Sequence, residues 1–246
     1  MPAPALFRFW LLLVLVLSAA PSAAAQEFWE KKDFTQWTEK ECRRLLEDSP
    51  WARQFTISTS FIQEILREPA GALGRETNPK ITYTAQLRSA LPVRRALVRL
   101  QQFAQKYETL EPVDKQAFDI QASKYLDTKF PDSVVILIEF NSNVQPYASE
   151  LDLYWKRYTE DQARNDIFLV TPAGQRLKLS RFVLQPQGAG FHLVFPRLVN
   201  GEPITAGGKG ELHIELPHPN IGNLGAHRVL LSFAVAKLAA EGALQY

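Results

Sequence analysis

The sequence predicts an α+β fold, in which a small helical N-terminal part is followed by an immunoglobulin-like antiparallel β-sandwich. Apolar residues recur at helical spacing before residue 130, and at alternate or consecutive positions after it. The 16 prolines and 12 glycines supply the many turns of a β-rich protein. Hydrophobic residues make up 46% of the chain and charged residues 22%, which excludes disordered, collagen-like and multi-pass membrane proteins.

The N-terminus has the pattern of a secretory signal peptide. Arg8 gives a short positive region, residues 9–18 are apolar, and Ala23-Ala24-Ala25 matches the motif for cleavage before Gln26. The alternative is an uncleaved membrane anchor, which would need about 20 apolar residues. Because Pro21 ends the run too early, we expect a periplasmic or extracellular protein with no stable membrane anchor after cleavage.

An aromatic loop and a short helix are expected next. Four aromatic residues crowd into ten positions: Phe28, Trp29, Phe34 and Trp37. Thr38 and Glu41 form a capping box, which satisfies free amides at a helix start. Three residues then share one apolar helix face: Cys42, Leu45 and Leu46. Pro50 ends this helix and directs Trp51 inward.

Two strands and two helices should follow before residue 130. We expect a strand around Phe55–Ile62, an exposed loop at residues 67–80 and a half-buried strand over Ile81–Leu87. A helix begins with Pro92 in its first turn, and its apolar stripe contains Val93, Ala96, Leu97, Leu100, Ala104 and Tyr107. A second helix spans Val113–Asp127, with an inward face made of Phe118, Ala122, Tyr125 and Leu126.

Short strands dominate the rest of the chain. We expect seven, at Val134–Phe140, Leu151–Trp155, Ile167–Val170, Arg176–Leu184, Phe191–Phe195, Glu211–Leu216 and His227–Val235. Pro172-Ala173-Gly174 forms a hairpin connection. A single cysteine cannot pin two sheets, so antibody-type domains are excluded. The predicted division is a signal peptide at 1–25, a mainly helical region at 26–130 and a β-sandwich domain at 131–246.

Two motifs near the helical part are recognisable. The first runs from Trp37-Thr38-Glu39 into Leu45-Leu46-Glu47-Asp48-Ser49-Pro50-Trp51-Ala52, and the second is Ser89-Ala90-Leu91-Pro92-Val93-Arg94-Arg95-Ala96. With the predicted sandwich behind them, they resemble a family of uncharacterised exported proteins from Gram-negative soil bacteria. The resemblance covers most of the mature chain. It implies bacterial export and a helical part joined to a β part, and it implies no reaction because the family has no established activity.

Charge gives no sign of a nucleic-acid partner. The chain has 28 basic and 26 acidic residues, a net charge of +2, which creates no long-range field for such a ligand. One local concentration of basic residues exists, formed by Arg88, Arg94, Arg95 and Arg99. We interpret it as a solvated helix face whose members pair with nearby acids.

Four histidines are the candidate metal ligands: His192, His213, His218 and His227. A catalytic zinc needs three protein ligands, which His213, Glu215 and His227 would supply if the fold brought them together. His213 and Glu215 share the face of a strand that should point to solvent, and His218 lies in a turn between two prolines. We therefore favour four solvated or locally bonded histidines and expect neither a metal nor a cofactor.

Other candidates for chemistry also have structural interpretations. Cys42 would be a nucleophile beside a histidine and an acid, but its position on an apolar helix face favours a buried, inert thiol. Gly207-Gly208-Lys209-Gly210 lacks the spacing of a phosphate loop and precedes a strand, so it should be a turn. The aromatic group around Trp37 is either core, which we favour, or an exposed binding patch.

No catalytic motif is found in the sequence, so we predict no catalytic residue. We expect an exported cell-envelope protein with a non-enzymatic interaction or structural role, whose partner is another protein or a polymer of the envelope. The alternative is a hydrolase with a site at the junction of the helical and β parts. A histidine within hydrogen-bond distance of a carboxylate or of Cys42 in a pocket would support that alternative.

Overall fold

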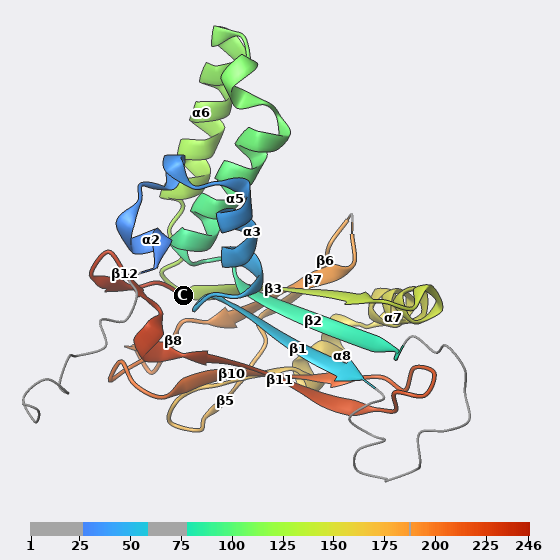
Figure 1. The fold of residues 1–246 in the computed structure, drawn as a ribbon. Helices are drawn as coiled ribbons and strands as arrows, with labels where there is room; N and C mark the ends of the chain where they lie inside the picture. Colours follow the sequence, from blue (N-terminus) through green and yellow to red (C-terminus); the bar gives the residue numbers. More distant parts are fainter. Residues whose placement is uncertain (1–26, 59–77, 187) are drawn as a thin grey trace, which may run out of the picture.

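A computed structural model of the chain describes residues 27–58, 78–186 and 188–246 (Figure 1). The expected signal peptide, most of the expected loop at 67–80, and the last four residues of the expected strand Phe55–Ile62 lie outside the described residues. Within these ranges, no helix combines the length and the apolar character needed to cross a bilayer.

Two antiparallel sheets form the centre of the molecule. The first has the strand order β1-β2-β3-β7-β6, and the second has the order β11-β10-β4-β5. The strands of the first are β1 (Ala52–Ser58), β2 (Lys80–Leu87), β3 (Ser133–Ser142), β6 (Arg181–Leu184) and β7 (Gly190–Pro196). Those of the second are β4 (Phe168–Val170), β5 (Arg176–Lys178), β10 (Glu211–His218) and β11 (His227–Ala234). Two short pairs complete the strands: β8 (Leu198–Val199) with β9 (Glu202–Pro203), and β12 (Ala239–Ala240) with β13 (Ala243–Leu244).

Helices lie at the ends and edges of these sheets (Figure 1). Early in the chain lie α2 (Phe28–Lys31), the 3-10 turn η1 (Phe34–Gln36), α3 (Glu39–Glu47), α5 (Leu91–Ala104), η2 (Tyr107–Thr109) and α6 (Pro112–Asp127). Later come α7 (Gln145–Arg157), α8 (Glu160–Asp166) and η3 (Val235–Lys237). The α+β class is therefore confirmed.

The core lies between the two sheets. Alternation along β2 buries Tyr83 and Ala85, and the strand register places them opposite Phe140 and Ile138 of β3. These residues share one hydrophobic cluster with the apolar faces of β10 and β11. At the edge, the Arg53 side chain of β1 donates a 3.2 Å hydrogen bond from Nε to the Ser232 carbonyl of β11. The sheets therefore pack face to face.

The five-stranded sheet draws strands from both sides of residue 130. Strands β1 and β2 come from the region expected to be mainly helical, and β2 pairs along its length with β3. The sheet thus crosses the division that we expected between residues 130 and 131. Helices α3 and α5 pack where this sheet ends, so helical and β parts share one core.

Helix α3 has the predicted capping box. The Glu41 amide donates to the Thr38 hydroxyl (3.2 Å), and the Glu41 carboxylate accepts from the Thr38 amide (2.8 Å). The three predicted apolar residues are buried, and Trp51 is buried just after the helix ends. The aromatic segment before it is two short helical turns, α2 and η1, where a loop was expected.

Helices α5 and α6 form a hairpin that projects away from the sheets (Figure 1). Helix α5 ends at Ala104 because Lys106 adopts a left-handed backbone (φ 51°) that turns the chain, so the predicted stripe is longer than the helix. The predicted inward face of α6 is at most half-buried, and Tyr125 is 38% exposed. Helix α5 packs along one side of α6, which leaves much of that face in solvent.

Two strand predictions in the second half of the chain are wrong. Leu151–Trp155 belongs to helix α7, because Leu151, Trp155 and Tyr158 recur at helical spacing and share one buried face. The run Arg176–Leu184 is divided at residues 179–180 into β5 and β6, which join different sheets. The hairpin at Pro172-Ala173-Gly174 is confirmed between β4 and β5, with Gly174 at a positive φ of 80°.

Candidate functional site

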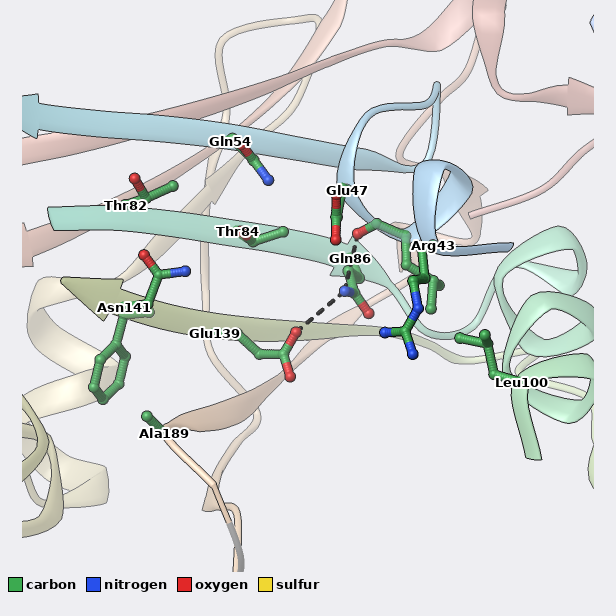
Figure 2. A pocket seen from close by; sticks show the side chains of 12 residues that line it. Arg43, Glu47, Gln54, Thr82, Thr84, Gln86, Leu100, Glu139, Asn141 and Ala189 are labelled. Carbon is green, nitrogen blue, oxygen red and sulfur yellow. Dashed lines mark hydrogen bonds between the residues drawn. The ribbon is translucent and has the colours of Figure 1, made fainter. Parts of the chain in front are cut away.

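A polar groove of about 640 Å³ lies on the outer face of the five-stranded sheet (Figure 2). Helix α3 and the β1–β2–β3 part of the sheet supply most of its lining, and α5 and the β6–β7 connection supply the rest. The lining residues are Arg43, Leu46, Glu47, Gln54, Thr82, Thr84, Gln86, Leu100, Glu139, Phe140, Asn141 and Ala189. The groove therefore lies at the junction of the helical and β parts.

Strand register gathers the polar side chains of the groove floor. Thr84 of β2 lies opposite Gln54 of β1 and opposite Glu139 of β3, while Thr82 lies opposite Asn141. Because side chains alternate along a strand, all of them project from the face opposite the core. The alternation of polar and apolar residues over Ile81–Leu87 predicted which side chains of β2 share a face. It did not show which residues of other strands would lie beside them.

Gln86 lies at the end of the groove floor nearest α3 and links α3 to β3 by hydrogen bonds. Its side chain is 4% exposed, and its Nε2 donates to the Leu46 carbonyl (2.9 Å) and to Glu139 Oε2 (3.2 Å). Because both partners are acceptors, the amide nitrogen must face them, and the orientation of the side chain is fixed. The buried Gln86 Oε1 then has no donor among the described residues. Such an unsatisfied acceptor costs about 1–3 kcal/mol.

Two carboxylates line the same groove. Neither Glu47 nor Glu139 forms an ion pair with a described residue. Arg43, a lining residue of opposite charge, donates to Glu39 at 3.1 and 2.6 Å. Arg88 is close enough to Glu139 for their charges to interact. Burial lowers the pKa of the Arg88 guanidinium, and the smaller effects of Tyr125 and Glu139 raise it. The groove is thus richer in acceptors than in free donors.

The structure separates the residues considered as zinc ligands. His213 Nδ1 lies 2.7 Å from Ser232 Oγ, and Glu215 pairs with Arg176. His227 lies opposite His218 at the far end of β10, where their rings stack with centroids 6.1 Å apart. In the described ranges, no three His, Cys, Asp or Glu side chains are grouped to hold a metal. As predicted, His213 and Glu215 project from the face opposite the buried residues of β10.

His218 was predicted to lie in a turn and to be solvated or locally bonded, and this is wrong. It belongs to β10, is 2% exposed, and its Nδ1 lies 2.8 Å from Tyr83 Oη. The β10 alternation carries it inward past the flanking prolines. Burial lowers the pKa of His218 to about 4, and the neighbouring His227 acts in the same direction. Burial also lowers the pKa of His192, with a smaller contribution from Arg88.

Two other sequence candidates have the structural roles that we favoured. Cys42 is fully buried, and burial raises the pKa of its thiol to about 11, which keeps it protonated and unreactive. Gly207-Gly208-Lys209-Gly210 is a turn that leads into β10. Its three glycines have φ between 63° and 87°, a range that L side chains rarely adopt.

The arginines on α5 are only in part a solvated face. Arg94 is 5% exposed, and its Nη1 donates to three carbonyls at the C-terminal end of α6, those of Tyr125, Leu126 and Thr128. Free carbonyls at a helix end need donors, which is why this arginine is buried. Arg95 is half-buried and pairs with Glu241, as expected for pairing with a nearby acid, and Arg99 Nε donates to the Trp37 carbonyl at 3.0 Å.

The N-terminal aromatic group packs as an extension of the core. Trp37 is buried and its Nε1 donates to the Lys32 carbonyl (3.2 Å). Phe28 meets Trp37 edge-to-face at 5.5 Å, and Trp29 meets Trp51 in the same way at 5.7 Å. The core interpretation is therefore confirmed for Trp37, whereas Phe28, Trp29 and Phe34 are half-buried against it.

Comparisons with protein-family models, with curated proteins and with solved structures find no match to this chain. The groove is therefore interpreted from its own chemistry. Among the described residues, one histidine comes within 4 Å of a carboxylate: His213 Nδ1 lies 3.9 Å from Glu211 Oε2 on the half-exposed face of the other sheet. This pair is remote from the groove lining.

Proposed function

We propose that this is an exported cell-envelope protein that binds a polar ligand in the groove and acts without catalysis. Export to the periplasm or the extracellular space is supported by the pattern of the first 25 residues and by the resemblance to exported proteins. The groove supports binding because amide, hydroxyl and carboxylate side chains gather there from α3, β1, β2 and β3.

The unsatisfied Gln86 Oε1 is the observation that carries this proposal. A buried acceptor that lacks a donor destabilises the folded protein, and a ligand that donates to it removes this cost. Binding sites commonly keep such polar groups in place before the ligand arrives. Gln86 is held by two hydrogen bonds, so it is positioned in advance for this role.

The second candidate is a hydrolase with its site in the same groove. It is favoured by the position of the groove at the helical–β junction and by the presence of two carboxylates, Glu47 and Glu139. Paired carboxylates are the acid and base of glycoside hydrolases. Loss of bound ligand with the appearance of cleaved product would support this candidate over simple binding.

We also propose that the two sheets form an immunoglobulin-like sandwich. Both are antiparallel and pack face to face, and the chain crosses from one to the other between β5 and β6 and again before β10. Such crossings are typical of Greek-key sandwiches. This sandwich would include β1 and β2, and so would be larger than the one expected for residues 131–246.

The binding function can be tested with the mature chain, residues 26–246, on arrays of envelope peptides and glycans. A Gln54→Ala, Asn141→Ala double variant removes two exposed polar side chains from the groove. We expect it to lose the ligand that the native protein binds. The control is Gln116→Ala with Asn220→Ala, which removes the same chemistry from exposed positions elsewhere. Equal binding by both double variants would contradict the proposal.

A further inference from the structure

We propose that the groove binds an extended, positively charged peptide segment of a partner protein. This inference rests on the proposed binding function and names the ligand class for the same groove. The ligand should donate hydrogen bonds, because the lining contains acceptor capacity that no described residue fills, at Gln86 Oε1 and at the two carboxylates. Gln86 Oε1 is unsatisfied, and both carboxylates lack a described cationic partner within ion-pair distance. The Gln86 amide nitrogen already donates to Leu46 and Glu139, and Arg43 donates from Nε and Nη2 to Glu39.

The charges of the lining favour cationic ligands over anionic ones, because the one cationic lining residue, Arg43, is paired with Glu39 and the two carboxylates have no such pair. Glu47 is exposed at the α3 side of the groove, and Glu139 lies across Gln86 from it (Figure 2). Phosphate-bearing or carboxylate-bearing polymers would meet these two negative charges. A lysine ammonium or arginine guanidinium would instead replace the missing cationic partner, in a hydrogen bond between opposite charges.

The floor of the groove suits a peptide better than a sugar. Sugar rings bind with their C–H faces against exposed aromatic rings, and the one aromatic lining residue, Phe140, is buried with its ring in the core. Side-chain amides of Gln54 and Asn141 are exposed along the floor and can pair with the N–H and C=O groups of a main chain. Leu100 and Ala189 at the rim provide apolar contact for the methylene stem of a lysine.

The test uses calorimetric titration of the mature chain at low salt. The probe is an acetylated, amidated hexapeptide of alternating lysine and glycine, and the comparison ligands are its glutamate counterpart, spermidine and a chitin oligomer. We expect the lysine peptide to bind, added salt to weaken binding, and the glutamate peptide and chitin oligomer not to bind. Glu139→Gln and Glu47→Gln should each weaken binding about tenfold, as expected for loss of one charge-assisted hydrogen bond.

Matched variants distinguish the loss of a charge in the groove from an effect on folding. Glu139→Gln keeps an oxygen that can accept from Gln86, so the floor should stay intact. Glu150→Gln makes the same charge change on an exposed part of α7, and it should bind the peptide as the native protein does. Unchanged affinity in both groove variants would overturn the inference, as would absence of binding at about 1 mM peptide.

The remaining outcomes distinguish this inference from the proposed function. Binding of the chitin oligomer in place of the lysine peptide, lost in the Gln54→Ala, Asn141→Ala variant, would overturn the peptide ligand and leave the binding function standing. Spermidine binding as tightly as the peptide would assign the groove to free amines and also overturn the peptide ligand. Cleavage of any probe would overturn the non-enzymatic function itself.

Discussion

Buried polar side chains connect the layers of this protein. Tyr83 of β2 and His218 of β10 meet between the two sheets, and Arg94 of α5 reaches the end of α6. Gln86 joins the α3 end to β3 on the outer face. None of these contacts was predictable from spacing, because each joins residues more than 30 positions apart. Sequence patterns report which face a residue shares with its near neighbours, and not its partner across the core.

His218 should make stability depend on pH. Its folded pKa of about 4 lies below the unfolded value of about 6.5, so the unfolded state binds more protons between these values. The free energy of unfolding therefore has its full value, as far as His218 is concerned, above pH 6.5. It decreases as the pH falls towards 4, by on the order of 3 kcal/mol. Urea unfolding between pH 7 and pH 4 measures this loss.

The matched variants for this prediction are His218→Gln and His213→Gln. Glutamine does not titrate and can still bond with Tyr83, so His218→Gln should remove most of the pH dependence that His218 contributes. His213 is half-exposed on the opposite face of β10, so its replacement is the control for loss of a histidine outside the core. The same slope in the His218→Gln variant as in the native protein would contradict the argument.

Helices and strands were predictable where local chemistry decides them. The Thr38–Glu41 capping box and the strand over Ile81–Leu87 depend on neighbours a few residues apart, and both are confirmed, although β2 is buried at every position from Tyr83 to Leu87, where a half-buried strand was expected. Leu151–Trp155 was wrong because its apolar residues fit two periods within so short a window, and Tyr158, which decides for a helix, lies just beyond it. The poor burial of α6 depends on how many other elements pack against it, and that is a tertiary property.

Arg94 should hold the α5–α6 hairpin together. Arg94→Met keeps most of the side-chain volume but leaves three α6 carbonyls without their donor. We expect a loss of about 2–3 kcal/mol, as for a hydrogen-bonded charged group, measured by thermal or urea unfolding. Arg95→Met removes a pair with the exposed Glu241 and should cost less than about 1 kcal/mol. Equal losses in the two variants would show that Arg94 has no special role.

The buried Trp51 side chain should contribute strongly to the stability of the packing near α3. It is fully buried, touches Trp29 edge-to-face, and its Nε1 donates to the Gln245 carbonyl at 3.0 Å, close to the C-terminal residue. Trp51→Ala should therefore cost about 3–5 kcal/mol, seen as a lower melting temperature. Leu153→Ala, at a 47% exposed position of α7, is the comparison and should change stability little. Native stability in Trp51→Ala would refute the core assignment.

Over the residues that the structure describes, segments that the sequence analysis had separated share one hydrophobic core. The groove shows the consequence, because its lining is drawn from positions 43 to 189. Individual lining residues carry weak local signals: Thr82, Thr84 and Gln86 alternate with apolar neighbours, and Glu47 ends a helix. Their assembly depends on the register of β1, β2 and β3 and on where α3 packs. A site at this junction was expected only under the alternative hydrolase hypothesis, and none of the lining residues could be predicted.

Removal of the first 25 residues should leave this assembly intact. Glu27 and Phe28, directly after the predicted cut before Gln26, already contact the folded body: Glu27 pairs with Arg44 at 3.0 Å, and Phe28 packs on Trp37. From the signal-peptide pattern, we expect export of the full chain in a Gram-negative host to yield a mature protein that begins at or within a few residues of Gln26. Intact-mass spectrometry of the envelope fraction measures this.

Replacing Ala23 and Ala25 with glutamine should block cleavage, because signal peptidases need small residues there. A native envelope protein that retains Met1 would show that this segment is an uncleaved anchor.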